Sequence, residues 1–481
     1  MTREVATDRS RARWTRWDGW AIALVTLAGG VIRCWHLTVP KYIVFDEYYY
    51  AQDACVFVKP PSLCGIASPL SEEHPLLAKW LIAAGIKVFG YAPFGWRVMP
   101  VVVGIAGIAL TYLLARRLLR STVAAALAAG LLAVDGMHFV LSRTAMLDGF
   151  VTTFAIATIL FVVLDRDRER HEHERVRDRP WLAAAGVADG AAVASKWSGI
   201  PFLLVAILLV IVWDRAAARE RGSTSRWGAV RADLGPLVVW LVMLPLLIYV
   251  LSFAGRLDGR VLALPWDHGS WAWAFLRRQV HILTFHTGLN GSHPYESPAW
   301  SWPLLKRPVV FEFNDTSGSI REILAIGNPV VWWGGSIAAA ACAVRWVRAR
   351  RGTRRWAEPE GVILAGVAAG YLWWLPVTSE RSFSFIFYFL PAVPFLCIAI
   401  ARVAQRTWSR ASGRAATAVV VAAAVGWFVY FLPMLTFRPM DPGAWNARIW
   451  FSDCRPEGVR GDPPRPLVGH VVPPPSGWCW R

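Results

Sequence analysis

Two adjacent carboxylates, Asp46 and Glu47, begin the stretch of this chain best suited to chemistry, because three tyrosines follow them and a long apolar segment precedes them. Neighbouring carboxylates repel each other and partial burial disfavours ionisation, so one of the two can act as a base near neutral pH. Acidic residues are also common at a helix N-terminus, where they complement the helix dipole. The residues alone leave both interpretations open.

The next polar group belongs to an amphipathic segment that begins near His74 and runs to about residue 88. Apolar residues recur there at helical spacing, which predicts a helix lying along the membrane surface. We expect Lys79 to emerge from this helix at the interface, where its amine meets a lipid phosphate or simply extends to the headgroups.

Two further arginines lie at the outer ends of apolar segments. Arg97 opposes the usual bias of basic residues toward the cytoplasm, so we expect it to have a partner: Asp46, Glu47 or a phosphate. Arg143 and Asp148 flank a tight outer turn, where an internal ion pair and a functional role agree equally with the sequence.

Lys196 lies within apolar sequence, where an ionisable group is costly unless it is paired or faces water. Asp189, seven residues earlier, shares its helix face and is the expected structural partner. At another outer turn, we expect Arg381 either to bind a phosphate oxygen or to pair with Glu380.

A polar, aromatic and proline-rich stretch at 291–304 predicts a shaped, ordered loop that is too short for a separate domain. His293, Tyr295 and Trp302 lie in it. These three side chains are expected to contact a substrate or to shape the loop.

Composition indicates the class of protein that must position these residues. Of 481 residues, 55% are hydrophobic and 17% charged, and the mean hydropathy is +0.39, values typical of a polytopic membrane protein. A hydrocarbon core about 30 Å thick needs roughly 20 apolar helical residues. Hydrophobic patterning predicts eleven spans, at 19–36, 96–115, 122–141, 146–164, 181–195, 197–213, 235–254, 323–344, 360–377, 384–401 and 416–436.

The basic residues indicate how these spans are oriented. The net charge of +18 would suggest nucleic acid if it lay on one soluble domain, but 29 of the 51 Lys and Arg residues fall in short loops between spans. Those loops are 1–18, 116–120, 166–179, 215–231, 345–356 and 402–414. With eleven spans they share one side, which the positive-inside rule assigns to the cytoplasm. A single long helix across 181–213 would reverse everything downstream.

This topology predicts three parts and places the polar residues outside. The parts are a cytoplasmic basic N-terminus at 1–18, a transmembrane domain at 19–436 and an extracytoplasmic tail at 437–481. The outer loops at 37–95 and 255–322 belong to the second part.

The seven cysteines include no Cys-x-x-Cys pair, but Cys55 lies close to Cys64, and Cys454 and Cys479 share the tail. Each pair can form a disulfide if it faces an oxidising compartment. No cluster of His, Asp and Glu compels a metal site, so a requirement for divalent metal is left open.

Taken in order, these segments resemble the protein O-mannosyltransferase family in its bacterial, actinobacterial-type form. The resemblance covers nearly the whole chain and depends on 45–47, 74–79, 143–148, 195–199, 293–304 and 388–391 together. It implies an all-α polytopic protein with the GT-C fold, about eleven transmembrane helices and amphipathic interfacial helices in the first outer loop. Leu76 and Ala78 stand where the family usually has proline and glycine.

The resemblance also implies an activity, namely transfer of mannose from polyprenyl-phosphate-mannose to Ser and Thr hydroxyls of secreted proteins by one inverting displacement. It assigns Asp46 as the base and Glu47 as the carboxylate that orients acceptor or sugar. The donor and its phosphate are then bound by His74, Lys79 and Arg381, the supporting residues are Arg97, Arg143, Asp148 and Lys196, and the acceptor or loop residues are His293, Tyr295 and Trp302.

Expected partners are the lipid donor, a translocating unfolded polypeptide rich in Ser and Thr, membrane lipid and the secretion translocon, but no nucleic acid. The expected location is the cell membrane, with the active site outside. Two other classes agree with the sequence: a GT-C transferase that uses the same donor for a lipid or cell-wall glycan, and a transporter. A transporter is expected to show internal repeats, and the sequence shows none.

Overall fold

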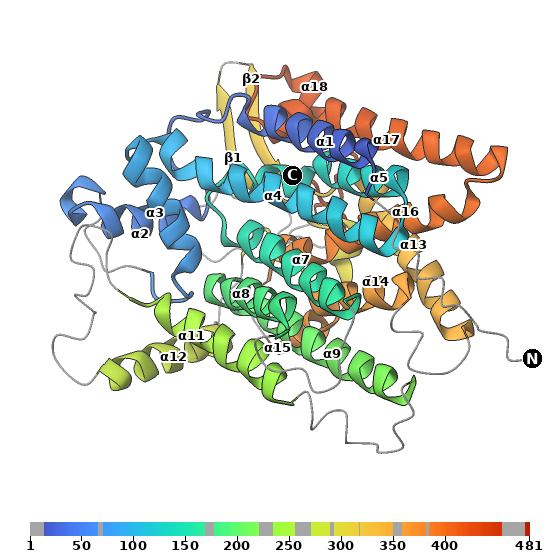
Figure 1. Ribbon diagram of the computed structural model, residues 1–481. Helices are drawn as coiled ribbons and strands as arrows, with labels where there is room; N and C mark the ends of the chain where they lie inside the picture. The colour runs from blue at the N-terminus through green and yellow to red at the C-terminus, as the bar shows by residue number, and fades with distance from the viewer. Residues whose placement is uncertain are drawn as a thin grey trace, which may run out of the picture.

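Helices form most of the structure in the computed structural model, which describes residues 14–65, 71–168, 178–220, 234–254, 271–288, 293–316, 318–349, 358–380, 384–454 and 477–481 (Figure 1). The first elements are α1 (Arg16–Cys34), α2 (Glu47–Val58), η1 (Pro61–Leu63), α3 (Leu77–Phe89), α4 (Pro93–Leu119), α5 (Thr122–Ala133), α6 (Gly136–Leu141), α7 (Leu147–Arg166), α8 (Pro180–Ser195), η3 (Trp197–Gly199) and α9 (Ile200–Glu220). They are followed by η4 (Val239–Met243), α11 (Leu244–Leu251), α12 (Trp271–Gly288), η5 (Ala299–Leu304), β1 (Val309–Thr316), β2 (Ser319–Ala325), α13 (Pro329–Arg348), α14 (Pro359–Val367), η7 (Ala368–Leu372), α15 (Trp374–Glu380), η8 (Ile386–Ala392), α16 (Val393–Thr407), α17 (Ala411–Leu435) and α18 (Pro442–Asn446).

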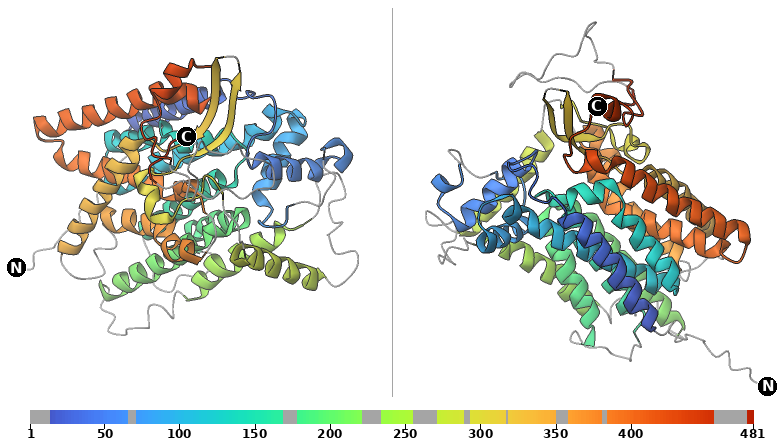
Figure 2. Two further views of the ribbon diagram at one scale, coloured as in Figure 1. Left: turned by 180° about the vertical axis from the view of Figure 1, so that it is seen from behind. Right: turned by 90° about the horizontal axis from the view of Figure 1, so that it is seen from above.

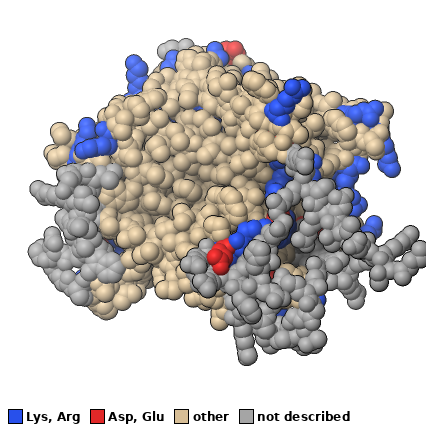
Figure 3. Space-filling view, viewed as in Figure 1, with Lys and Arg blue, Asp and Glu red and all other residues tan. Residues whose placement is uncertain are grey.

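Within the described residues, eight helical segments are long and apolar enough to cross a membrane. They are Pro93–Leu119, Leu147–Arg166, Trp197–Arg219, Leu234–Leu251, Pro329–Arg348, Pro359–Val377, Ile386–Thr407 and Ala411–Leu435. The other three predicted spans coincide with α1, which carries charged residues, and with the shorter α5 and α8, of 12 and 16 residues. Figure 3 shows a face with few charged side chains across its centre, as suits contact with lipid.

The helix break predicted between 195 and 197 is confirmed. Lys196 has an extended backbone, with φ −164° and ψ 142°, between the end of α8 and the start of η3. By contrast, the single span predicted at 122–141 is interrupted, because α5 ends at Ala133 and Asp135 caps a new helix, α6. The Asp135 carboxylate accepts hydrogen bonds from the main chains of His138 and Asn328.

The structure contains an antiparallel hairpin of β1 and β2 that the sequence analysis did not predict. The span predicted at 323–344 is wrong at its start, because residues 323–325 belong to β2 and α13 begins at Pro329. A bulge between Val310 and Glu312 leaves Phe311 out of register. Alternating apolar residues in 309–316, followed by a Ser-Gly turn, are the signal that could have revealed the hairpin.

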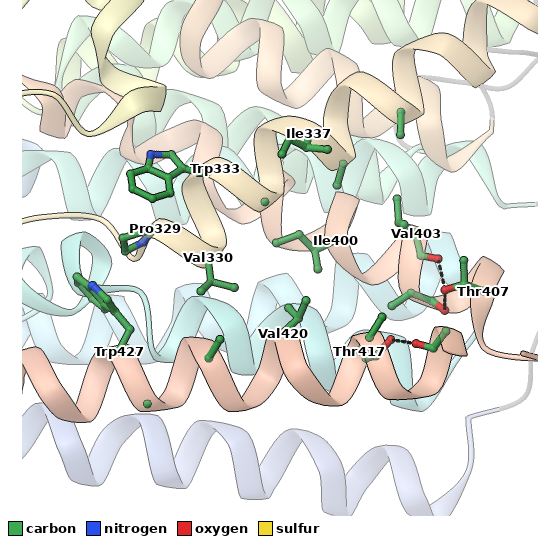
Figure 4. Close-up of a pocket in the computed structure, with 18 of the residues that line it drawn as sticks. Pro329, Val330, Trp333, Ile337, Ile400, Val403, Thr407, Thr417, Val420 and Trp427 are labelled. Carbon is green, nitrogen blue, oxygen red and sulfur yellow. Dashed lines mark hydrogen bonds between the residues drawn. The ribbon is translucent and has the colours of Figure 1, made fainter. Parts of the chain in front are cut away.

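The elements of the predicted outer loops gather at one end of the helix bundle. Figure 2 shows α2, α3 and the hairpin at the end opposite the chain's N-terminus. On another flank, α13, α16 and α17 line an apolar groove of about 870 Å³ (Figure 4). The hydroxyls of Thr407 and Thr417 in its lining donate within their own helices, so the groove presents an apolar surface.

Close packing of α8 on η4 depends on Gly186. A Cβ atom there would lie 1.8 Å from the Trp240 carbonyl oxygen, whereas a Cβ at Gly426 of α17 would meet nothing within 4 Å. We expect Gly186→Ala to destabilise the protein by about 1–3 kcal/mol through overpacking and to lower its melting temperature. Gly426→Ala is the matched control and should melt at or above the temperature of the unaltered protein. Equal melting temperatures for the two variants would contradict this packing.

Candidate active site

Asp46 stands at the N-terminal end of α2, and the residue before it limits its position. Phe45 has a left-handed backbone, with φ +45°, which is uncommon and strained for a bulky side chain. Its ring stacks on Phe311 at 4.4 Å, and Phe385 and Phe387 pack edge-on against it. Burial of these rings offsets the backbone strain and holds Asp46 at this place.

Asp46 is half-buried as a residue, and among the described residues none donates a hydrogen bond to its carboxyl. Burial raises the pKa of Asp46 to about 7, while the charge of Lys196 opposes this rise and that of Asp148 adds to it. A carboxyl group with such a pKa accepts a proton readily near neutral pH. The surroundings of the Asp46 carboxyl therefore differ from those of the adjacent Glu47 carboxyl.

Glu47 is fully buried and enclosed by donors. Arg97 binds both of its oxygens, through Nε at 2.9 Å and Nη2 at 2.8 Å. The main-chain N–H groups of Val44 and Ala145 and the indole N–H of Trp96 donate three more hydrogen bonds. Of the three partners expected for Arg97, Glu47 is the one that binds it in the structure. The Glu47 carboxylate thereby joins separate segments of the protein.

Lys196 and Asp148 form the ion pair that acts on Asp46. The Lys196 amine lies 2.9 Å from each Asp148 oxygen and 4.2 Å from the centre of the Tyr388 ring. The pairing expected with Asp189 is wrong, because Asp148 on α7 takes the amine. Both Asp189 oxygens are buried without a hydrogen-bond partner among the described residues.

Arg143 does not pair with Asp148 either, so the internal ion pair considered for this turn is absent. Its guanidinium group instead donates to main-chain carbonyls at the end of α1, those of Ile32, Arg33, Trp35 and His36. Carbonyls at a helix C-terminus lack partners within the helix and favour a positive charge. Arg143 therefore fixes the start of the linker that leads from α1 to Asp46.

Lys79 is buried, which corrects the expectation that it emerges at the interface. Its amine lies 2.6 Å from an Asp53 oxygen, 2.8 Å from the Ser71 carbonyl and 3.0 Å from the Ser71 hydroxyl. A buried cation requires such partners because it has lost its hydration. Sequence reasoning missed Asp53, although a carboxylate on the apolar side of α2 was a usable signal.

His74 lies before α3, three residues ahead of its first residue, and meets a residue that sequence reasoning also missed. The His74 ring is 5.1 Å from the ring of His286 on α12 and 6.0 Å from that of Tyr50 on α2. The Nε2 atom of His286 lies 2.9 Å from the Glu73 carbonyl oxygen. The segment before α3 and the helix α12 thus meet beside α2, the helix that Asp46 begins.

Of the predicted loop residues, His293 contacts Phe45, with the two rings edge-on at 6.5 Å. The His293 ring packs edge-on against Phe385 at 4.9 Å. Burial, together with the charge of Arg307, lowers the pKa of His293 to about 4, so the ring is neutral at pH 7.

Tyr295 and Trp302 stabilise this loop. The Arg307 guanidinium group lies 4.8 Å from the centre of the Tyr295 ring. Trp302 is fully buried, and its indole N–H donates to the Ser297 carbonyl. Arg381, the remaining phosphate candidate, lies outside the described residues, as does its expected pairing with Glu380.

Two disulfides are present, joining Cys55 to Cys64 and Cys454 to Cys479. The first ties the end of α2 to the turn that follows it, with Cα atoms 5.8 Å apart. Among the described residues, no group of three or more His, Cys, Asp and Glu side chains is arranged to hold a metal ion.

Comparison with known proteins shows the family to which the chain belongs. Residues 23–257 match a family described as dolichyl-phosphate-mannose-protein mannosyltransferase, and residues 272–454 match the C-terminal four-transmembrane region of protein-O-mannosyltransferase. The chain belongs to the protein O-mannosyltransferase family. It is 32% identical over 496 residues to a polyprenol-phosphate-mannose–protein mannosyltransferase of Mycobacterium tuberculosis, covering 92% of each chain.

Other family members support the same assignment. The corresponding Mycolicibacterium smegmatis protein is 30% identical over 493 residues, covering 92% of this chain and 94% of that one. The protein O-mannosyltransferase complex of S. cerevisiae bound to the sugar donor has a chain with a TM-score of 0.75, at 14% identity, covering 92% of this chain and 93% of that one. At that identity the likeness concerns the fold, and it confirms the GT-C fold.

If Glu47 holds the fold of this family member together, its neutralisation must destabilise the protein. Glu47→Gln leaves the Arg97 charge buried without compensation, which should cost about 3–5 kcal/mol. We expect a lower melting temperature, measured in detergent or bilayer, accompanied by loss of activity. Glu312→Gln is a control, because that side chain is half-buried and accepts one hydrogen bond from Tyr42. An unchanged melting temperature in Glu47→Gln with lost activity would instead assign Glu47 to the substrate.

Proposed function

We propose that this membrane protein transfers mannose from polyprenyl-phosphate-mannose to Ser and Thr hydroxyls of secreted polypeptides, with inversion at the sugar. One observation carries the assignment of the site: Asp46 is a half-buried residue whose carboxyl has a pKa raised to about 7, held beside the Lys196–Asp148 ion pair. Family membership supports the donor, because the actinobacterial relatives are named for polyprenol-phosphate-mannose.

In the proposed reaction Asp46 acts as the base. The acceptor hydroxyl oxygen forms a bond to the anomeric carbon of mannose, the bond from that carbon to the phosphate oxygen breaks, and the hydroxyl proton passes to the Asp46 carboxylate. The phosphate leaves with the bonding electrons and needs no proton. A single displacement therefore accounts for the inversion, and positioning of both substrates contributes much of the rate.

The departing phosphate requires positive charge, and we propose that Arg381 supplies it, with His74 and Lys79 shaping the donor site. Lys79 shares its charge with Asp53, so it contributes less to a phosphate than a free amine would. We propose that Arg97, Arg143, Asp148 and Lys196 support the site and that His293, Tyr295 and Trp302 shape its loop.

The proposed setting is the cell membrane, with the site on the extracytoplasmic side and the acceptor arriving unfolded, either from the secretion translocon or after it. The two disulfides support an oxidising side for the outer loop and the tail. A transfer assay with polyprenyl-phosphate-mannose and a Thr-rich, Pro-containing peptide, with and without chelator, tests the function and its metal requirement. Mannose found only on a lipid or glycan would favour the alternative function, a GT-C transferase that uses the same donor for a lipid or cell-wall glycan.

Replacement of the base should abolish most transfer and leave the protein intact. A correctly placed base contributes about 10²–10⁴-fold, so we expect Asp46→Asn to lower kcat by that factor. Donor binding and melting temperature should stay near those of the unaltered protein, because no described residue bonds to this carboxyl. Near-normal turnover by Asp46→Asn would show that Asp46 is not the base.

The pH dependence of transfer provides a second, independent test of Asp46 as the base. Only the carboxylate accepts a proton, and burial raises the pKa of Asp46 to about 7. Transfer, measured as kcat/KM, should therefore rise about tenfold per pH unit below pH 7 and level off above it. The residual rate of Asp46→Asn should be flat over the same range. The same inflection in that variant would point to another group.

A further inference from the structure

The hairpin beside the site has two edges, and the chain itself covers one of them. In β2, the main-chain N–H and C=O groups of Ile320 both pair with Met440, at 2.8 and 2.9 Å. Because these groups point away from β1, Ile320 and its partner Asp315 form a pair without mutual main-chain hydrogen bonds. The N–H and C=O of Asp315 therefore point outward from β1.

The opposite edge is open along the part of β1 that the structure describes. Phe313 lies two positions from Asp315, so its main-chain groups also point outward. No main-chain group of another described element bonds to this edge. Phe313 is 47% exposed, and Asp315 is exposed as well. In Figure 1, β1 lies on the side of the hairpin that faces α2 and α3, and β2 on the side of α17 and α18.

The bulge in β1 connects this open edge to the proposed base. Its extra residue, Phe311, stacks on Phe45, the residue before Asp46. Bulges commonly redirect a side chain next to an active site. Asp315 and Phe311 are four positions apart, so a strand lying along β1 extends about 13 Å toward the site, at about 3.3 Å per residue.

We propose that an extended segment of the acceptor polypeptide pairs with the outer edge of β1 as an added strand, which brings a Ser or Thr further along that segment to Asp46. The inference rests on the proposed transfer to a polypeptide. Main-chain pairing suits an unfolded acceptor because it depends little on the acceptor's side chains. The opposite edge provides a precedent, since the Ile320–Met440 pairing already adds a segment to this sheet.

N-methylated acceptor peptides test this pairing on the unaltered, full-length protein in bilayers. Each peptide carries one methyl group on a successive main-chain nitrogen, to one side of the acceptor Thr. Alternate N–H groups of a strand face its partner, so the peptide KM should rise about 3- to 10-fold at every second position and change little between. Equal effects at all positions, or at none, would overturn the proposal.

A pair of protein variants tests the main-chain hydrogen bond that Asp315 is proposed to donate to the acceptor. Asp315→Pro deletes the outward N–H without removing a hydrogen bond of the β1–β2 ladder. Asp315→Ala removes the carboxylate and keeps the N–H. We expect the peptide KM to be about 3- to 10-fold higher in the proline variant than in the alanine variant, with equal kcat and equal donor binding. Equal KM values in two folded variants would overturn the proposal.

The remaining outcomes are also decisive. If the proline variant fails to fold, the peptide series decides, because it leaves the protein unchanged. Absence of transfer to every peptide, including the unmodified one, would contradict the proposed function itself. Self-association that Asp315→Pro abolishes, with no change in peptide KM, would assign the edge to a second copy of the chain and overturn the proposal.

Discussion

The buried ion pair between Glu47 and Arg97 is the interaction on which the outer part of this protein depends. Arg97 binds both Glu47 oxygens and also donates to the carbonyls of Leu37, Pro40 and Tyr42. One side chain of α4 thereby fixes the linker after α1 and the first turn of α2. Because Glu47 is occupied in this way, its neighbour can face the site with its charge uncommitted. The two adjacent carboxylates therefore lie in different surroundings.

The contrast between paired and unpaired charged groups recurs among the buried residues around the site. Lys79 is paired with Asp53, and Lys196 with Asp148, so each of these two buried lysines has an acidic partner at hydrogen-bond distance. Such pairs limit the desolvation cost of placing charge inside a membrane protein. Asp46 has no such bond among the described residues, and neither has Asp189. Burial raises the pKa of Asp46 to about 7.

The sequence predicted the helical architecture well, because apolar spans and basic loops follow from the physics of the bilayer. It also predicted the helix break at Lys196, and it singled out Asp46, whose role as base stays a prediction. It could not assign partners, since Asp148 lies 48 residues from Lys196 and Asp53 lies 26 from Lys79. Asp189 illustrates the limit, because its spacing suits a helical pair but the extended backbone at 196 turns the lysine elsewhere. The hairpin was missed because apolar β-strands and the ends of apolar spans look alike over a few residues.

The aromatic stack under Asp46 also has a consequence for the order in which the protein is made. Phe45 emerges early in synthesis, but the rings that hold its strained backbone belong to residues 311, 385 and 387. At about 5–20 residues per second, roughly 20 to 70 s pass between synthesis of Phe45 and of residue 387. During that time Asp46 lacks the support that sets its position. The proposed role of Asp46 therefore links competence of the site to near-completion of the polypeptide, so that nascent fragments of this protein would be inserted in the membrane but catalytically silent.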